Sequence, residues 1–299
     1  MKRIFLFIIT NIAVMLVLMI SFHLICALCG VDTYELSKHG INYASLAVFS
    51  LVFGMGGAII SLLASKFIAK WSVGAVVVDG TENAETAWLV NTVTQLAAQA
   101  RLRTPEVAIY AGPANAFATG AFRNSALIAV SDGIMGQMTK SEMRAVLGHE
   151  MAHIQNGDMV TMTLLQGILN AFVIFISRLL AHTVASSGDG RRRGSSGLFF
   201  LVYYVSQIVF GIAASLIVYA FSRRREYAAD AGSAKLIGNR ADMIAALERL
   251  GNLKPGILPD SLKAMGIAGK KGDSLFSTHP SLQNRIEALR TAQYDNGAV

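Results

Sequence analysis

Two histidines and a glutamate near the middle of the chain have the spacing of a metal-dependent catalytic motif. His149, Glu150 and His153 lie in the segment GHEMAH. On a helix, residues four positions apart share a face, so both imidazoles can direct a ring nitrogen at one ion. Zinc lowers the pKa of a bound water to about 7, and a nearby carboxylate can then accept its proton. The segment therefore predicts two zinc ligands and a general base.

The residues around this motif have the pattern of a helix. Thr139 and Glu142 form a capping box at its expected start. Apolar residues recur on one face, namely Met143, Val146, Leu147 and Ile154. The simplest alternative is a helix on which two histidines share a face without binding metal.

The composition of the 299-residue chain is typical of a membrane protein, since 53% of its residues are hydrophobic and only 15% are charged. The net charge of +7 is explained by Lys and Arg beside membrane segments. Because the basic residues do not alternate with aromatic ones, we expect no nucleic-acid partner. Cys26 and Cys29 have no second pair to complete a zinc ribbon, and they imply no disulfide framework.

Four apolar segments are long enough to cross a bilayer, which takes about 20 helical residues. They are Ile4–Val31, Ile41–Ser65, Met159–Ser177 and Gly194–Ser222. The first two predict a transmembrane hairpin within residues 1–70, and the last two predict a second hairpin within residues 159–222. Lys and Arg flank the shared end of the first hairpin, so the positive-inside rule places that end in the cytoplasm.

The loop of the second hairpin carries Arg191, Arg192 and Arg193, which the positive-inside rule disfavours on the outer side. Two arrangements therefore stay open, a hairpin that spans the bilayer and a shallower, partly buried one. In both, the chain before Asp158 and the chain after Ser222 emerge on the same side. A metal ligand missing from the first part can then come from the second.

Two soluble segments, residues 71–158 and 223–299, together have the length of one compact domain. We expect strands at Ala75–Val78, Pro105–Tyr110 and Ser125–Val130. We expect helices from Thr81 to about Arg101, from Arg223 to about Leu236, at Ala241–Leu250 and at Pro280–Leu289. The predicted fold class is therefore α+β, predominantly helical, with four membrane segments and a small sheet.

The segment Asn115–Thr119 lies between two predicted strands and upstream of the predicted metal helix. A protease can hold an extended substrate as an additional strand on a sheet edge. The candidate substrate-binding residues are therefore Asn115, Ala116, Phe117 and Ala118. An ordinary hairpin strand explains the same spacing equally well.

A catalytic zinc ion usually has three protein ligands. The extended motif with a third histidine is excluded, because Asn156 and Met159 occupy its glycine and histidine positions. The next glutamate after Glu150 is Glu226, on the expected side of the membrane. Asp230 lies one turn further along and could accept the second ring N–H of a ligand histidine. Solvated charges beside an arginine run are the alternative for both carboxylates.

His279 is the candidate for stabilising the oxyanion that develops on the substrate carbonyl, as a protonated histidine could. Of the other histidines, His23 lies in an apolar segment, His39 on the opposite side of the membrane and His182 near the far end of the second hairpin. A histidine that merely begins a helix explains this position about as well.

Four motifs of the chain, and the order in which they occur, resemble those of the membrane-anchored zinc metalloproteases of the HtpX type, which are related to the Ste24 and Oma1 proteases. The motifs are NAFATG at 115–120, HEMAH followed by NGD at 149–158, the block from Arg223 to Asp230, and THP at 278–280. The resemblance covers nearly the whole chain. It implies a gluzincin-type zinc peptidase fold beside a four-segment membrane part.

The resemblance also implies roles for single residues. One Zn²⁺ would be bound by His149, His153 and Glu226, with Glu150 as general base and then acid. The segment from Asn115 to Ala118 would line the substrate cleft. Among the other motif residues, Asn156, Arg223 and Asp230 are assigned to the surroundings of the ligands.

The implied biological role is quality control of membrane proteins under stress. The expected partners are protein substrates, chiefly membrane proteins, and the lipid bilayer. The expected location is the bacterial inner membrane, with the catalytic domain in the cytoplasm. The basic loop at Arg191 to Arg193 is not part of the family pattern.

Two other functions stay open on the sequence. An intramembrane protease would carry its HExxH motif inside a membrane segment, whereas here Arg144 and Asp158 bracket the motif and place it at the water boundary. A non-catalytic membrane scaffold would bind zinc structurally, with four protein ligands and no exchangeable water.

Overall fold

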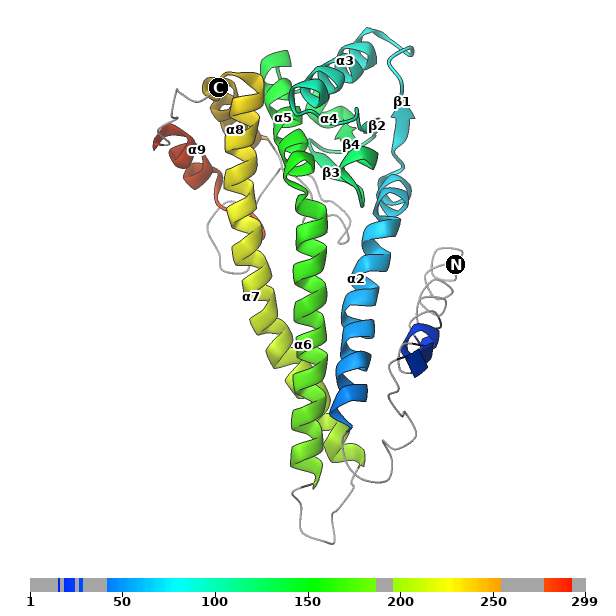
Figure 1. Ribbon diagram of the computed structural model, residues 1–299. Coiled ribbons are helices and arrows are strands. Elements are labelled where there is room, and N and C mark those ends of the chain that lie inside the picture. Colours follow the sequence, from blue (N-terminus) through cyan, green and yellow to red (C-terminus); the bar gives the residue numbers. More distant parts are fainter. Residues whose placement is uncertain are drawn as a thin grey trace. The chain divides into compact units, whose positions relative to one another are not determined.

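The computed structural model describes residues 42–186, 196–253 and 277–291, with short helical pieces between 16 and 28 (Figure 1). These parts are predominantly helical and contain one small sheet, as the sequence predicts, and the sheet has four strands. Some predictions lie outside the described residues, namely those for most of Ile4–Val31, for Cys26 and Cys29 and for the loop at Arg191 to Arg193.

Three of the described helices are long and apolar enough to cross a bilayer. They are α2 (Tyr43–Val73), α6 (Asp158–Ser186) and α7 (Ser196–Ile237). Helix α2 continues past Ser65, the end of the predicted apolar run. Lys66 and Lys70 lie in this extension, and their ammonium groups reach Glu106, with Nζ–Oε distances of 2.6 and 3.3 Å.

The chain divides into two compact units. One unit comprises Met1–Ser61 and Met162–Val218, and the other comprises Leu62–Thr161 and Tyr219–Val299. The second unit contains the sheet and all the residues to which the sequence assigns chemistry. Helix α7 runs without a break from the first unit into the second, so Glu226 and Asp230 are carried by the continuation of a long apolar helix.

The sheet has the strand order β1-β2-β4-β3. Its strands are β1 (Val76–Val78), β2 (Glu106–Tyr110), β3 (Ala116–Thr119) and β4 (Leu127–Ser131). The β2–β4 pair is parallel, whereas β1–β2 and β3–β4 are antiparallel. The sheet is therefore mixed, and β3 forms one of its edges. The three strands expected from the sequence are present, with ends shifted by one or two residues.

Helices α3 (Ala84–Gln99) and α5 (Lys140–Asn156) contribute to the main core with one face of the sheet. Leu89, Val146 and Ile128 are fully buried there. Helices α8 (Arg240–Asn252) and α9 (Leu282–Thr291) extend this core through Met243, Leu247, Ile286 and Leu289. On the other face of the sheet, a smaller cluster includes Phe117 and Tyr110 with Ala69 from the end of α2.

The ends of α5 are fixed by capping groups. Thr139 and Glu142 form the expected capping box, with the Thr139 N–H donating to Glu142 Oε2 at 2.8 Å. At the other end Gly157 adopts the left-handed conformation, with φ of 71°, that favours glycine. Helix α6 begins at the next residue, so Asp158 lies directly beyond the last turn of α5. The short remaining elements are α4 (Asp132–Met135) and the 3₁₀ turn Arg123–Ser125.

Candidate metal centre

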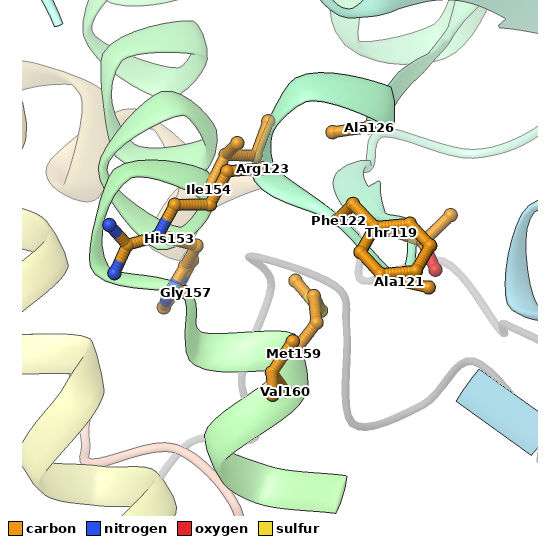
Figure 2. Close-up of a pocket in the computed structure, with 11 residues that line it drawn as sticks. Thr119, Ala121, Phe122, Arg123, Ala126, His153, Ile154, Gly157, Met159 and Val160 are labelled. Atoms are coloured by element: carbon orange, nitrogen blue, oxygen red, sulfur yellow. The ribbon is translucent and has the colours of Figure 1, made fainter. Parts of the chain in front are cut away.

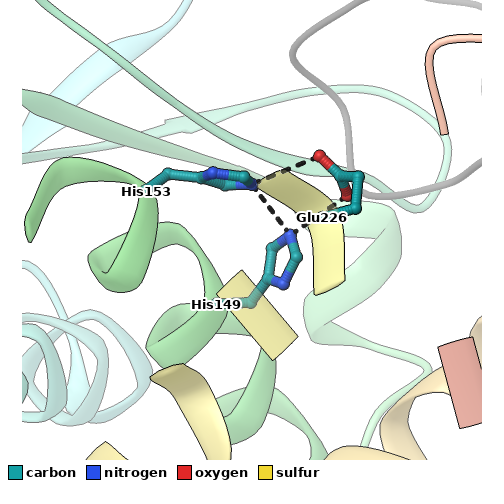
Figure 3. Close-up of side chains that lie close together, drawn as sticks. All are labelled: His149, His153 and Glu226. Carbon is teal, nitrogen blue, oxygen red and sulfur yellow. Dashed lines mark hydrogen bonds and ion pairs between the residues drawn. The ribbon is translucent and has the colours of Figure 1, made fainter. Parts of the chain in front are cut away.

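Helices α5 and α7 bring His149, His153 and Glu226 to one point (Figure 3). The two Nε2 atoms lie 3.1 Å apart, and the carboxylate oxygens of Glu226 lie 3.5 Å from His149 Nε2 and 3.4 Å from His153 Nε2. All three side chains are buried. A tetrahedral ion with bonds of about 2.0–2.1 Å holds its ligand atoms about 3.3–3.4 Å apart, which these separations match.

Each imidazole has a carboxylate behind it. His149 Nδ1 lies 2.9 Å from Asp230 Oδ1, and His153 Nδ1 lies 2.6 Å from Asp158 Oδ2. A carboxylate that accepts the Nδ1–H leaves the lone pair of Nε2 for a metal ion. Both Nε2 atoms therefore face the shared point in the tautomer that a ligand needs.

The electrostatics of this group favour a cation. Burial alone would keep His153 neutral, but hydrogen bonds to Asp158 and Glu226 raise its pKa to about 10. Glu226 Oε2 is buried without a hydrogen-bond partner. The carboxylates thus stabilise positive charge between the rings, and a divalent ion would supply it in place of a proton. The donor set of two imidazoles and one carboxylate suits Zn²⁺.

Glu150 lies on the same turn of α5 as the ligand histidines. Burial is the largest influence on the Glu150 carboxyl, and it raises the pKa of this group to about 7. The backbone of Ala118 lies beside this carboxyl and opposes the increase in its pKa, while Oε2 is buried without a hydrogen-bond partner. The carboxylate is thus held beside the edge strand with one oxygen available, and near neutral pH it can both accept and return a proton.

Arg285 of α9 is fully buried behind the ligand group. Its Nε and Nη2 atoms donate to the two oxygens of Asp230 at 2.8 and 2.7 Å, and its Nη1 lies 3.5 Å from Glu226 Oε2. Burial opposes its charged form, but Asp230 and Glu226 outweigh that effect and raise its pKa further. This bidentate contact fixes the carboxylate that orients His149.

His279 lies beside the same group, with its Nε2 atom 3.7 Å from Glu226 Oε1. Burial lowers its pKa to about 4, so its imidazole is neutral at neutral pH rather than protonated as the sequence suggested. It can still stabilise an oxyanion by donating an N–H. Arg223 connects this segment to α7 by donating to the Ser277 carbonyl at 3.0 Å.

The segment Asn115–Thr119 offers mainly its backbone and one amide. The side-chain oxygen and nitrogen of Asn115 are buried without partners. The Phe117 ring packs near Tyr110 in the smaller core cluster, with centroids 5.8 Å apart, so it does not face the main core where Ala116 and Ala118 lie. A peptide at this edge would therefore meet the main chain of β3 and the Asn115 amide.

Small residues let α5 and α7 approach closely. A Cβ atom on Gly232 would lie 2.8 Å from the Cβ of Ala152, and one on Gly148 would lie 2.7 Å from Ser233 Oγ. Ser233 Oγ in turn donates to the Ala145 carbonyl at 2.7 Å. This close crossing is what allows the short Glu226 side chain to reach both histidines.

The match to a known family covers most of the chain. Residues 83–293 match the family model described as peptidase family M48. The chain belongs to peptidase family M48.

Full-length M48 relatives support a narrower grouping. A protease HtpX homolog of Bordetella petrii is 53% identical over 293 residues, which are 97% of this chain and 98% of the relative. Another from Neisseria meningitidis serogroup C is 56% identical over 97% of this chain and 100% of the relative. The predicted resemblance is confirmed, and this M48 peptidase is a membrane metalloprotease of the HtpX type.

The fold of this M48 peptidase is shared with a solved structure. The crystal structure of S. mikatae Ste24p matches 93% of this chain and 67% of its own chain, with a TM-score of 0.58. Because the two sequences are only 19% identical, this likeness concerns the fold.

For two residues at the centre of this M48 peptidase, Asp158 and Arg285, the sequence analysis predicted no contact with the metal-binding group. Asn156, which was expected near the ligands, is exposed at the end of α5, where its backbone carbonyl accepts a hydrogen bond from Arg123. Asp158, two residues later, contacts His153 instead. A signal for Arg285 was present, because it interrupts the apolar stripe that Leu282, Ile286 and Leu289 form on α9.

Proposed function

We propose that this M48 peptidase is a zinc-dependent endopeptidase of the bacterial inner membrane that cleaves misfolded or damaged membrane proteins at the cytoplasmic face. The observation that carries the proposal is the convergence of His149, His153 and Glu226 within 3.5 Å of one another, with Glu150 beside them. These are the parts that hydrolysis of a peptide by an activated water requires.

The chain's own residues divide the chemistry. His149, His153 and Glu226 would hold one Zn²⁺, which when bound supplies the positive charge that acidifies a water and polarises the scissile carbonyl. Glu150 accepts a proton from the attacking water and passes it to the leaving nitrogen. The N–H of His279 stabilises the oxyanion, and the edge strand β3 holds the peptide extended.

The position of the motif favours this function over the two alternatives. HExxH lies on α5, in the unit that contains the sheet, and outside the three candidate membrane helices of the described chain. The metal group found among the described residues has three members rather than the four of a closed structural site. Both facts support a peptidase that acts at the water boundary.

The test compares metal content and casein cleavage in detergent for the parent and for Glu150→Gln. We expect Glu150→Gln to keep its zinc and lose cleavage, because the amide cannot accept the proton. Glu85→Gln, at an exposed position of α3, is the matched control and should cleave like the parent. A Glu150→Gln variant that still cleaves would refute the assignment, and zinc retained after Glu226→Ala would move the third ligand elsewhere.

A further inference from the structure

A shallow hollow that opens to solvent lies next to His153 (Figure 2). One side is formed by the end of β3 and the loop that follows it, and the other by the end of α5 and the first turn of α6. The residues that matter most for its chemistry are Ala121, Phe122, Ala126, Ile154, Met159 and Val160. The hollow is therefore largely apolar, and it is lined in part by His153, one of the proposed metal ligands.

Two polar side chains of the wall have hydrogen-bond partners. His153 uses Nδ1 for Asp158 and directs Nε2 at the ligand group. Arg123 donates through Nη2 to the Asn156 carbonyl at 3.3 Å, and Thr119 Oγ1 is buried without a partner. A charged side chain placed in this hollow would lose hydration, whereas an aliphatic or aromatic one would gain from burial. The space therefore suits an apolar side chain.

The position of the hollow relates it to a bound peptide. The Glu150 carboxyl lies beside the backbone of Ala118, which places the reacting point near that residue, and the next residue, Thr119, already lines the hollow. A peptide strand advances about 3.4 Å per residue, so the hollow lies within two residues of the scissile bond. Antiparallel pairing, the slightly more stable mode, puts the amino-terminal half of the peptide at the Thr119 end of β3.

We propose that this hollow is a specificity pocket that accepts a large apolar side chain from one of the two substrate residues preceding the scissile bond. The inference rests on the proposed endopeptidase function and deepens it. Met159 and Val160 belong to the first turn of a candidate membrane helix, and Phe122, 65% exposed, stands at the rim. The pocket is thus suited to apolar residues at the junction of a membrane segment and a soluble segment.

The test maps cleavage sites in a peptide library derived from a bacterial proteome, using the zinc-loaded full chain in detergent and mass spectrometry. The parent should prefer Leu, Phe or Met at one of the two preceding positions. Ala121→Phe fills the pocket and should reduce cleavage after large apolar residues there about tenfold relative to Ala or Gly, the scale expected when a hydrophobic pocket changes by a few carbon atoms. Ala121→Asp should lower the same preference and favour Lys or Arg.

Ala98→Phe, at an exposed position of α3, is the matched control and should keep the parent profile. Zinc content checks that each variant retains its metal site. Unchanged profiles in both Ala121 variants, or a parent preference only at positions after the scissile bond, would overturn the pocket. Absence of cleavage by the zinc-loaded parent, or cleavage retained by Glu150→Gln, would instead overturn the proposed function.

Discussion

Arg285 offsets much of the negative charge that is buried around the two ligand histidines. Glu226 and Asp230 are both almost completely buried, and Arg285 contacts each of them. Removing one member of such a buried group leaves the opposite charge uncompensated and is strongly destabilising. The arginine therefore helps to hold the carboxylates in place even before an ion binds.

We predict that Arg285→Met lowers the affinity for zinc about 10–100-fold, the range seen when the partner of a ligand-orienting group is lost. Asp230 would lose its bidentate contact and fix His149 less well. Arg285→Lys should recover only part of the affinity, because an ammonium keeps the charge without the planar fork. Competition with a chelator in detergent measures the change.

The control for this prediction lies on the same helix. Arg290 pairs with Glu248 at the surface, with an Nη2–Oε1 distance of 3.0 Å and both side chains more than half exposed. Arg290→Met should bind zinc like the parent. A parent-like affinity in Arg285→Met would show that Asp230 is held adequately without the arginine.

At the residue scale, the sequence predicts what local spacing can encode. His149, Glu150 and His153 follow from helical geometry, and Glu226 follows from elimination together with the side of the membrane. The contact between Arg285 and the histidine group joins residues 136 positions apart, and no local pattern specifies such a pairing. The outward or inward direction of Phe117 likewise depends on a strand register that this short segment does not determine.

At the scale of elements, the crossing of α5 and α7 determines whether a ligand from each helix can share one ion. We predict that Gly232→Ala destabilises the protein by about 1–3 kcal/mol, the usual cost of overpacking, and weakens zinc binding. The added methyl group would lie 2.8 Å from the Cβ of Ala152, so α7 must move away from α5. Thermal unfolding in detergent and zinc titration measure both effects.

Two further variants test the cause. Adding Ala152→Gly to Gly232→Ala should restore stability, because the double variant exchanges the two side chains across the contact. Gly211→Ala lies on the same helix with no atom within 4 Å of the new Cβ, and it should be neutral or slightly stabilising. If Gly232→Ala unfolds at the same temperature as the parent, the close approach of α5 and α7 does not require a glycine at position 232.

The capping box of α5 predicts a pH dependence of stability. Although burial opposes the charged form, hydrogen bonds from Thr139 and the charge of Arg249 lower the pKa of Glu142 below its usual value of 4.5. A lowered pKa means that the ionised carboxylate stabilises the fold above pH 4.5, and that this contribution is lost as the pH falls through the folded-state pKa. Glu142→Gln should therefore be less stable than the parent at pH 7.

The same comparison at low pH supplies the check. As the pH falls through the folded-state pKa of Glu142, which lies below 4.5, the parent and Glu142→Gln should unfold at increasingly similar temperatures, because the parent carboxylate becomes protonated in both states. Unfolding followed by circular dichroism over a series of pH values measures the difference. A difference in unfolding temperature that stays constant until the parent unfolds in acid would show that the shape of the Glu142 side chain matters, and not its charge.

The sequence predicts the elements better than their arrangement. Caps and turn residues locate most helix and strand ends to within a few residues, but α2 and α6 continue eight and nine residues past the apolar runs that end at Ser65 and Ser177. In α2, Lys66 and Lys70 lie in this extension and pair with Glu106, forty and thirty-six positions away. The parallel pairing of β2 with β4 is also non-local, and no short pattern in either strand specifies it.

At the scale of the whole molecule, the metal centre joins distant parts of one unit. The two histidines on α5 come before the long helix α6, Glu226 lies near the end of the next long helix, α7, and the supporting Arg285 lies further on, in α9. Because the unfolded chain does not hold these groups together, the free energy of zinc binding contributes to folding. The ion would act as a crosslink within the unit formed by residues 62–161 and 219–299.

We therefore predict that chelation of zinc loosens this unit selectively. A ligand present at about 1,000 times its dissociation constant stabilises a fold by about 4 kcal/mol, and its removal should reduce hydrogen-exchange protection in α5, in the part of α7 after Val218 and in α9. Protection in the part of α7 before Tyr219 should change little, because that part belongs to the other unit. His153→Ala should resemble the chelated parent and respond no further to chelator. Equal loss of protection along all of α7 would show instead that the helix responds as one body, and that the ion stabilises more than the unit in which its ligands lie.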